Sequence, residues 1–273
     1  MPTESDTIAA ASTPATRQSL ADDLRRLGVT PGMTLLVHTA LSALGWIAGG
    51  PVALIQALQD VLTPAGTLVM PSHSGDLTDP VLWNHPPVPP EWWPIIREQS
   101  PAFDPALTPT RGMGRTAELF RTWPGVLRSN HPHTSFAAWG KQAVFVTANQ
   151  TLVGCLGEGS PLARIYDLDG HVLLLGVKHG NDTSLHLAEY RTGLAKPEIN
   201  GAPVFENGVR VWKEIVDIEL NSEVFEALGD DFERVYPVSI GRIACAEARL
   251  FPQRPAVDFA VGWMREHPAQ PGE

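Results

Sequence analysis

The chain has 273 residues, of which 43% are hydrophobic and 18% are charged, and its formal net charge is −10 at pH 7. These proportions are those of an ordinary globular protein that buries a sizeable core, and the negative charge disfavours nucleic acids and acidic membrane surfaces as partners while it favours cationic ligands. No apolar run approaches the roughly 20 residues of a membrane-spanning helix, and the N-terminus lacks the basic-then-apolar order of a secretory signal, so the sequence predicts a cytoplasmic protein without a membrane partner.

Residues 1–16 contain Ser, Thr, Ala and Pro without periodic apolar positions, which predicts a flexible tail. Residues 17–273 are predicted to form a single domain, since no internal repeat is visible. Its first helix is expected to begin near Ser19, to carry leucines on one face, and to end at Gly28.

Two strands and a helix follow in the order that is typical of an α/β protein. Residues 34–38 and 66–70 have the apolar runs of buried strands, and residues 51–61 between them have the pattern of a helix. A strand, helix, strand order predicts an α/β core with parallel strands.

Residues 71–110 lack any regular pattern, because nine prolines after Pro71 rule out long helices or strands there. A long irregular stretch in a folded domain is usually a functional lid or a binding loop. Its tryptophans at positions 83, 92 and 93 indicate that it packs against the rest of the protein.

Regular patterns return after this region. Residues 171–177 are the most strand-like segment of the chain, and their continuous apolar run predicts a central strand covered on both faces. The other expected elements are helices at 115–122, 182–192, 241–250 and 256–265 and strands at 135–138 and 211–220.

The segment 181–189 is the most informative for chemistry, because it follows the strongest strand and opens a helix. Ligands and catalytic groups of α/β proteins lie at this position. His186 and Glu189 are three residues apart and therefore share one helical face. A histidine here could take a proton from an attacking amine, or it could be a core histidine bonded to the backbone.

Two further segments have the composition of binding loops. Residues 128–136, Arg-Ser-Asn-His-Pro-His-Thr-Ser-Phe, could grip an anion or form a capped, solvated loop. Residues 38–50 place glycines and small hydroxyl residues before a helix, where backbone N–H groups can approach a phosphate. The second segment matches neither a Walker A loop nor the dinucleotide fingerprint.

Metal or cysteine chemistry has little support in the sequence. The nine histidines include no His-x-x-x-His spacing, so no metal ligands are predicted, although a metal-dependent hydrolase stays an alternative. Cys155 and Cys245 lie far apart outside any activating motif, and they are interpreted as small buried hydrophobic residues.

In order along the chain, these segments resemble the aminoglycoside N3-acetyltransferase family, also called the antibiotic acetyltransferase family, from about Ser19 to Met264. The resemblance rests on the series rather than on any single motif. Its segments are 38–50, Gly-Thr-Leu-Val-Met-Pro at 66–71, Pro-Ala-Phe-Asp-Pro at 101–105, 113–118, 128–136, Gly-Glu-Gly-Ser-Pro-Leu at 157–162, and Thr-Ser-Leu-His-Leu-Ala-Glu at 183–189. It implies an α/β/α sandwich around a largely parallel or mixed sheet, unlike the commoner acetyltransferase fold.

The resemblance also implies an activity. The family moves an acetyl group from acetyl-coenzyme A to the 3-amino group of the deoxystreptamine ring of aminoglycoside antibiotics, which confers resistance. By position His186 resembles the catalytic base, and an acidic residue would orient it. The candidates for that residue are Glu219, which we favour, and Asp217.

Further site residues are expected by the same resemblance. The expected coenzyme A contacts are His38, Thr39, Ser42, Gly45, Ser72, Met113 and Gly114. The family commonly has two serines where this chain has Thr39-Ala40, which removes at most one hydrogen bond, of the order of 1 kcal/mol. A polycationic acceptor calls for carboxylates, and the candidates are Asp76, Asp79, Asp104, Glu158 and Asp169.

Three other functions stay open at this point. The chain could acetylate a different amine with the same fold, hydrolyse a substrate with a metal ion, or bind coenzyme A without turnover. A homodimer is possible.

Overall fold

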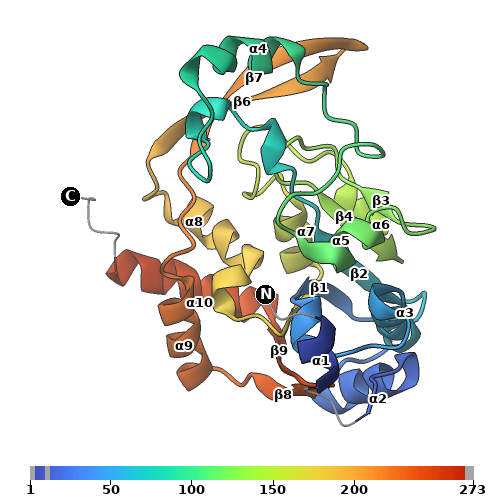
Figure 1. Ribbon diagram of the computed structural model, residues 1–273. Coiled ribbons are helices and arrows are strands. Elements are labelled where there is room, and N and C mark those ends of the chain that lie inside the picture. Colours follow the sequence, from blue (N-terminus) through green and yellow to red (C-terminus); the bar gives the residue numbers. More distant parts are fainter. Residues whose placement is uncertain (1–3, 10–12, 268–273) are drawn as a thin grey trace.

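A seven-stranded mixed sheet forms the centre of the computed structural model, which describes residues 4–9 and 13–267 (Figure 1). The strand order is β3-β4-β2-β1-β5-β9-β8. The inner strand β1 runs parallel to β2 and β5, whereas every other neighbouring pair is antiparallel. The bounds are β1 Thr34–Thr39, β2 Thr67–Pro71, β3 Leu127–Arg128, β4 Phe136–Gly140, β5 His171–Leu175, β8 Ser239–Ile243 and β9 Ala246–Pro252.

Helices cover both faces of this sheet, which makes an α/β/α sandwich. Successive strand residues point to opposite faces, so Leu35 and Val37 pack into one apolar cluster while Leu36 packs into the other. The first cluster includes residues of α2 Arg17–Leu27, α3 Gly50–Leu62 and α5 Gly114–Phe120. The second includes residues of α6 Ala143–Thr147, α7 Pro161–Asp167, α8 His186–Thr192, α9 Phe225–Val235 and α10 Gln253–Glu266. None of the helices within the described residues is long and apolar enough to cross a membrane.

A two-stranded hairpin, β6 Pro197–Glu206 and β7 Val209–Ile218, extends away from the central sheet (Figure 1). The irregular region between β2 and α5 packs against it and contains α4 Trp93–Gln99 with three short 3-10 helices, η2 Gly75–Leu77, η3 Pro80–Leu82 and η4 Pro90–Trp92. The N–H of Phe103 donates to the carbonyl of Pro203 at 3.0 Å. Arg210 of the hairpin donates to the carbonyl of Ser100 at 3.1 Å. The predicted loop region therefore packs against the hairpin, and the two lie together above the central sheet in the view of Figure 1.

Most of the predicted elements exist with shifts of a few residues, and the predicted stop of the first helix at Gly28 is confirmed by its left-handed φ of 114°. The predicted helix at 241–250 is wrong, because this segment forms β8 and β9, joined by a turn in which Ala244 has φ 50°. From Ala246 the buried positions alternate, which is the period of a strand. The sequence did not predict β3, β6, α4, α6, α7 or α9.

The predicted N-terminal tail is only partly irregular. Residues 4–9 form α1 Glu4–Ala9, whereas residues 1–3 and 10–12 of the predicted tail lie outside the described residues. Ala15 forms a backbone bridge to Ile47, so the tail joins the domain before the predicted boundary at residue 17.

Candidate active site

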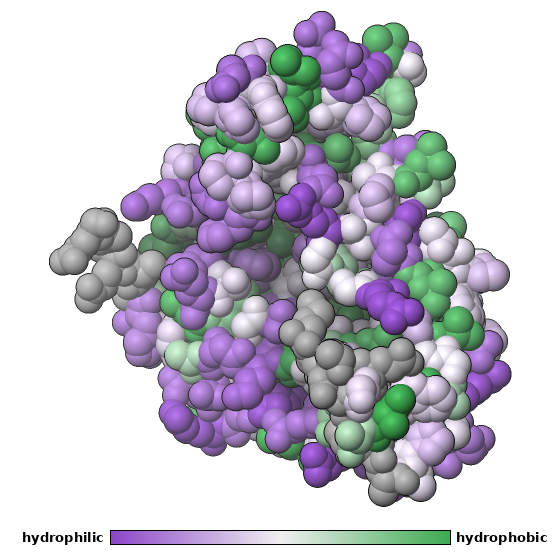
Figure 2. All heavy atoms as spheres, in the orientation of Figure 1, coloured by the Kyte–Doolittle hydropathy of each residue, from purple (hydrophilic) through white to green (hydrophobic). Residues whose placement is uncertain are grey.

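A cavity of about 230 Å³ lies at the carboxyl ends of β1 and β2. Parallel strands of α/β proteins present their ligand sites at this edge. Residues after β5 and at the start of α5 complete its wall. The lining residues are Val37, His38, Thr39, Met70, Pro71, His73, Gly112, Met113, Ala117, Val177, Gly180, Asn181, Asp182, Thr183, His186 and Ser222. Figure 2 shows a hollow between the hairpin region and the body below it, with mainly hydrophilic residues at its rim and some hydrophobic residues inside it.

His186 is the first residue of α8 and forms part of the wall of this cavity. Its Nδ1 lies 2.5 Å from Oε2 of Glu189, one helical turn further along. The other carboxylate oxygen of Glu189 accepts a hydrogen bond from the N–H of Asn221 at 2.7 Å. The ring of Phe225 packs 4.8 Å from the imidazole. Because Nδ1 is occupied by Glu189, Nε2 is the ring nitrogen that a ligand can reach.

The carboxylate that contacts His186 is thus Glu189, and neither Glu219 nor Asp217 makes the expected contact. Asp217 accepts hydrogen bonds from the hydroxyl of Tyr190 at 2.8 Å and from the N–H of Cys155 at 3.0 Å. Glu219 follows the end of β7, and its N–H donates to Lys196. The short i,i+3 spacing on a helix supplies the partner that was expected from a distant strand.

Two other histidines of the cavity wall, the buried His38 and the partly buried His73, are neutral at neutral pH because their pKa values are lowered. Burial lowers the pKa of His38 to about 4, although the nearby Asp182 raises it. Burial and the neighbouring His186 lower the pKa of His73 to about 3. The Nε2 atoms of both rings have no hydrogen-bond partner. At neutral pH these rings therefore present polar atoms to the cavity without adding positive charge.

The expected coenzyme A residues divide into two groups. His38, Thr39 and Met113 line the cavity, and the buried hydroxyl of Thr39 has no hydrogen-bond partner that would compete with a ligand. Ser72, Gly114, Ser42 and Gly45 are not among the lining residues, although Ser72 lies between two that are. Helix α3, which follows the 38–50 segment, begins at Gly50 without a side-chain cap, so its first N–H groups have no side-chain acceptor.

None of the five carboxylates expected to bind the acceptor lines this cavity. Each forms an ion pair or a hydrogen bond elsewhere in the folded protein. Asp76 pairs with Arg111, Asp79 with Arg97, Glu158 with Arg191, and Asp169 with Arg254, while Asp104 accepts from the N–H groups of Ala106 and Leu107. The sequence could not distinguish these paired carboxylates from free ones, because the arginine partners of Asp76, Asp79, Glu158 and Asp169 lie 18 to 85 residues away along the chain and meet them only through folding.

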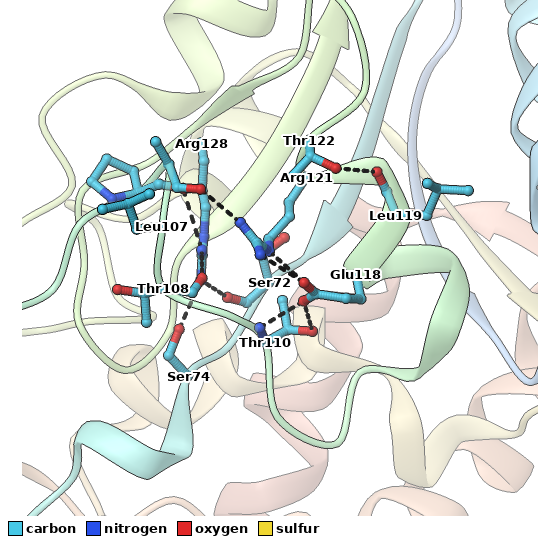
Figure 3. A network of polar contacts seen from close by, with 12 residues as sticks. Ser72, Ser74, Leu107, Thr108, Thr110, Glu118, Leu119, Arg121, Thr122 and Arg128 are labelled. Carbon is cyan, nitrogen blue, oxygen red and sulfur yellow. Dashed lines mark hydrogen bonds and ion pairs between the residues drawn. The ribbon is translucent and has the colours of Figure 1, made fainter.

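The segment 128–136, considered above for anion binding, is committed to internal contacts. The guanidinium of Arg128 donates to the carbonyl of Ser72 at 2.6 Å and to the hydroxyls of Ser74 at 2.7 Å and Ser135 at 2.9 Å (Figure 3). It also donates to the carbonyl of Thr108. Arg128 therefore ties the end of β2 to the loop before α5, and it has little capacity left for an anion.

Glu118 of α5 closes the other side of this network (Figure 3). It accepts hydrogen bonds from the N–H of Thr110 at 2.7 Å and from the guanidinium of Arg121 at 2.6 Å. Burial by itself raises the pKa of Glu118, but the hydrogen bonds from Arg121 and Thr110 outweigh burial and lower the pKa to about 2.

Replacing Glu118 with glutamine is expected to lower the free energy of unfolding by about 1 kcal/mol at pH 7, a figure that allows for solvent screening of this half-exposed carboxylate. Because the folded pKa is below the ordinary value of 4.5, the stabilisation is present above that value and is lost as the pH falls towards 2. Urea denaturation of both proteins at pH 7 and at pH 3 checks this expectation. A difference that stays constant between the two pH values would contradict it.

Cys155 and Cys245 do not form a disulfide, and within the described residues no group of three or more His, Cys, Asp or Glu side chains could hold a metal ion. Cys155 is buried, as expected, and burial together with the nearby Asp217 raises the pKa of its thiol to about 12. Cys245 is only half-buried.

Comparisons with known proteins all point to one family, that of the aminoglycoside 3-N-acetyltransferases. The family model described as aminoglycoside 3-N-acetyltransferase matches residues 36–265. The chain is 49% identical to the SPbeta prophage-derived aminoglycoside N(3')-acetyltransferase-like protein YokD of Bacillus subtilis (strain 168), over 92% of each chain. It is 36% identical to aminoglycoside N(3)-acetyltransferase VII of Streptomyces paromomycinus, over 93% of this chain and 92% of the relative.

Solved structures agree with these sequence matches. The crystal structure of YokD superposes with a TM-score of 0.95 at 46% identity, over 97% of this chain and 100% of that one. The structure of AAC-IIIb in a binary complex with CoASH superposes with a TM-score of 0.83 at 32% identity, over 96% of this chain and 100% of that one.

Proposed function

Because the chain belongs to the aminoglycoside 3-N-acetyltransferase family, we propose that it transfers the acetyl group of acetyl-coenzyme A to the 3-amino group of the deoxystreptamine ring of an aminoglycoside, and that it thereby confers resistance. The single observation that carries the assignment of its chemistry is the pair of His186 and Glu189 in the wall of the cavity. The sandwich fold and the relative that was solved with CoASH support acetyl-coenzyme A as the co-substrate.

In the proposed reaction, His186 acts as a general base through Nε2. The amine nitrogen attacks the thioester carbonyl carbon, and His186 takes a proton from that nitrogen as the C–N bond forms. The C–S bond then breaks, and the proton passes from His186 to the leaving sulfur. The products are the N-acetylated amine and free coenzyme A.

Glu189 is the positioning residue of this base. Its carboxylate holds Nδ1 of His186 and so keeps the other ring nitrogen directed to the cavity. It also stabilises the imidazolium that forms when the proton arrives. Its second oxygen is fixed by the N–H of Asn221, which holds the carboxylate in place.

We infer that the acceptor approaches from the side of the β6–β7 hairpin. Glu198 lies opposite Asp217 across this hairpin. Burial, then Glu219 and Asp217, raise the pKa of Glu198, so these side chains form a locally negative region. Glu219 is three residues before Ser222, which lines the cavity. A polycationic amine is attracted by such a region.

The acceptor's KM is therefore expected to rise with ionic strength, by roughly threefold between 50 and 500 mM KCl, because salt screens the attraction between the carboxylates and the ammonium groups. Steady-state kinetics with kanamycin at saturating acetyl-coenzyme A measures this effect. A KM that does not change with salt would count against an acidic acceptor site.

The experiment that tests the function is thiol release from acetyl-coenzyme A, followed with a thiol reagent, against gentamicin, kanamycin, neomycin and apramycin. Release that depends on an aminoglycoside establishes the reaction. Mass spectrometry and NMR of the product then locate the acetyl group. No release with any of the four, in a protein that binds coenzyme A, would contradict the proposed acceptor. The cytoplasmic location and the homodimer stay predictions.

A further inference from the structure

One charged group of the cavity has no role in the reaction as described so far. Asp182 is fully buried and lines the cavity that contains His186. Its Oδ1 accepts hydrogen bonds from the N–H of Ser184 at 2.9 Å and from the Ser184 hydroxyl at 2.6 Å. Its Oδ2 has no hydrogen-bond partner. A buried carboxylate oxygen without a donor is costly, so its presence in a cavity wall indicates a ligand that supplies one.

No cation forms a close ion pair with Asp182 among the described residues. Among the described residues its only ion-pair neighbour is His38, whose Nε2 lies 3.9 Å from Oδ1, beyond hydrogen-bond distance. Burial lowers the pKa of His38 to about 4, so that ring is neutral at physiological pH. The carboxylate of Glu189, in contrast, is occupied by His186 and Asn221. Asp182 is thus the open carboxylate of the cavity.

We propose that Asp182 is a further catalytic group of this site, whose free oxygen accepts an N–H of the attacking amine and stabilises the positive charge that develops on the amine nitrogen. The inference rests on the proposed acetyl transfer. A neutral primary amine has two N–H bonds. One hydrogen passes to Nε2 of His186, and the other stays on nitrogen as a hydrogen bond to Asp182. The nitrogen lone pair is then directed at the thioester carbon, and positive charge on nitrogen is stabilised by a fixed carboxylate in a water-poor site.

The test compares two neutral variants with a matched control. Asp182→Asn and Asp182→Ser both keep an oxygen that can cap the turn before α8, but they remove the charge. Ser184→Ala removes the hydroxyl that bonds Asp182 while it leaves the carboxylate. Thiol release with the best aminoglycoside gives kcat, calorimetry gives the Kd for coenzyme A, and thermal unfolding reports the fold.

We expect both Asp182 variants to lose about 10-fold to 100-fold in kcat, the effect of removing a charge-assisted hydrogen bond, with the Kd for coenzyme A changed less than about twofold. Ser184→Ala is expected to keep kcat within about threefold. The proposal is overturned by near-normal kcat in a folded Asp182 variant. It is also overturned by an equal loss in Ser184→Ala, which would assign Asp182 a purely structural role.

The wild-type protein separates this outcome from a failure of the proposed function. If it turns over no aminoglycoside, the proposed function fails, and Asp182 is tested by calorimetric binding of kanamycin to the coenzyme A complex. Weaker binding of kanamycin to Asp182→Asn, by at least about threefold, supports a carboxylate that receives an amine. Equal binding overturns the inference.

Discussion

Replacing His186 with alanine is expected to lower kcat by at least about 10²-fold, the effect of losing a general base. The variant keeps α8, because alanine has a high helix propensity, and it removes the group that Glu189 holds at 2.5 Å. Thiol release at saturating acetyl-coenzyme A and aminoglycoside measures kcat, and thermal unfolding confirms that the variant is folded.

His267→Ala is the matched control for this experiment. His267 follows α10, is exposed, and stacks on Trp263 far along the chain from the cavity residues. Its loss should leave kcat within about twofold. Near-normal turnover in a folded His186→Ala protein would remove His186 from the mechanism.

The second large effect is expected from Arg128→Met, which should lower the free energy of unfolding by about 3 kcal/mol. Methionine fills the space of the side-chain stem but donates no hydrogen bond, so the carbonyl of Thr108 loses its donor and the carbonyl of the buried Ser72 keeps only the hydroxyl of Ser135 (Figure 3). Burial and the nearby Arg121 lower the pKa of Arg128 to about 10. Urea denaturation measures the change.

Arg111→Met is the control for Arg128. Arg111 pairs with the carboxylate of Asp76, but its side chain is 55% exposed. Exposed ion pairs contribute at most about 1 kcal/mol, so this variant should be nearly as stable as the wild type. A loss of less than 1 kcal/mol in Arg128→Met would mean that the loop before α5 does not depend on the network.

The sequence by itself determined those features that depend on near neighbours along the chain. The apolar runs of β1, β2 and β5 and the periodic face of α3 predicted these elements because a strand or helix is recognised by its own repeat. His186 and Glu189 were placed on one helical face by their spacing alone. The ordered series of motifs identified the family, which the comparisons confirm.

Only the tertiary structure decided which polar groups are free and which are occupied. Asp79 and Glu158 were plausible acceptor ligands in the sequence, yet folding brings Arg97 and Arg191 to them from distant positions. Asp182 had no role of its own in the segment 181–189, yet folding buries it in the cavity wall without a close cation. Charge state and availability follow from burial and from long-range contacts, which a linear pattern does not contain.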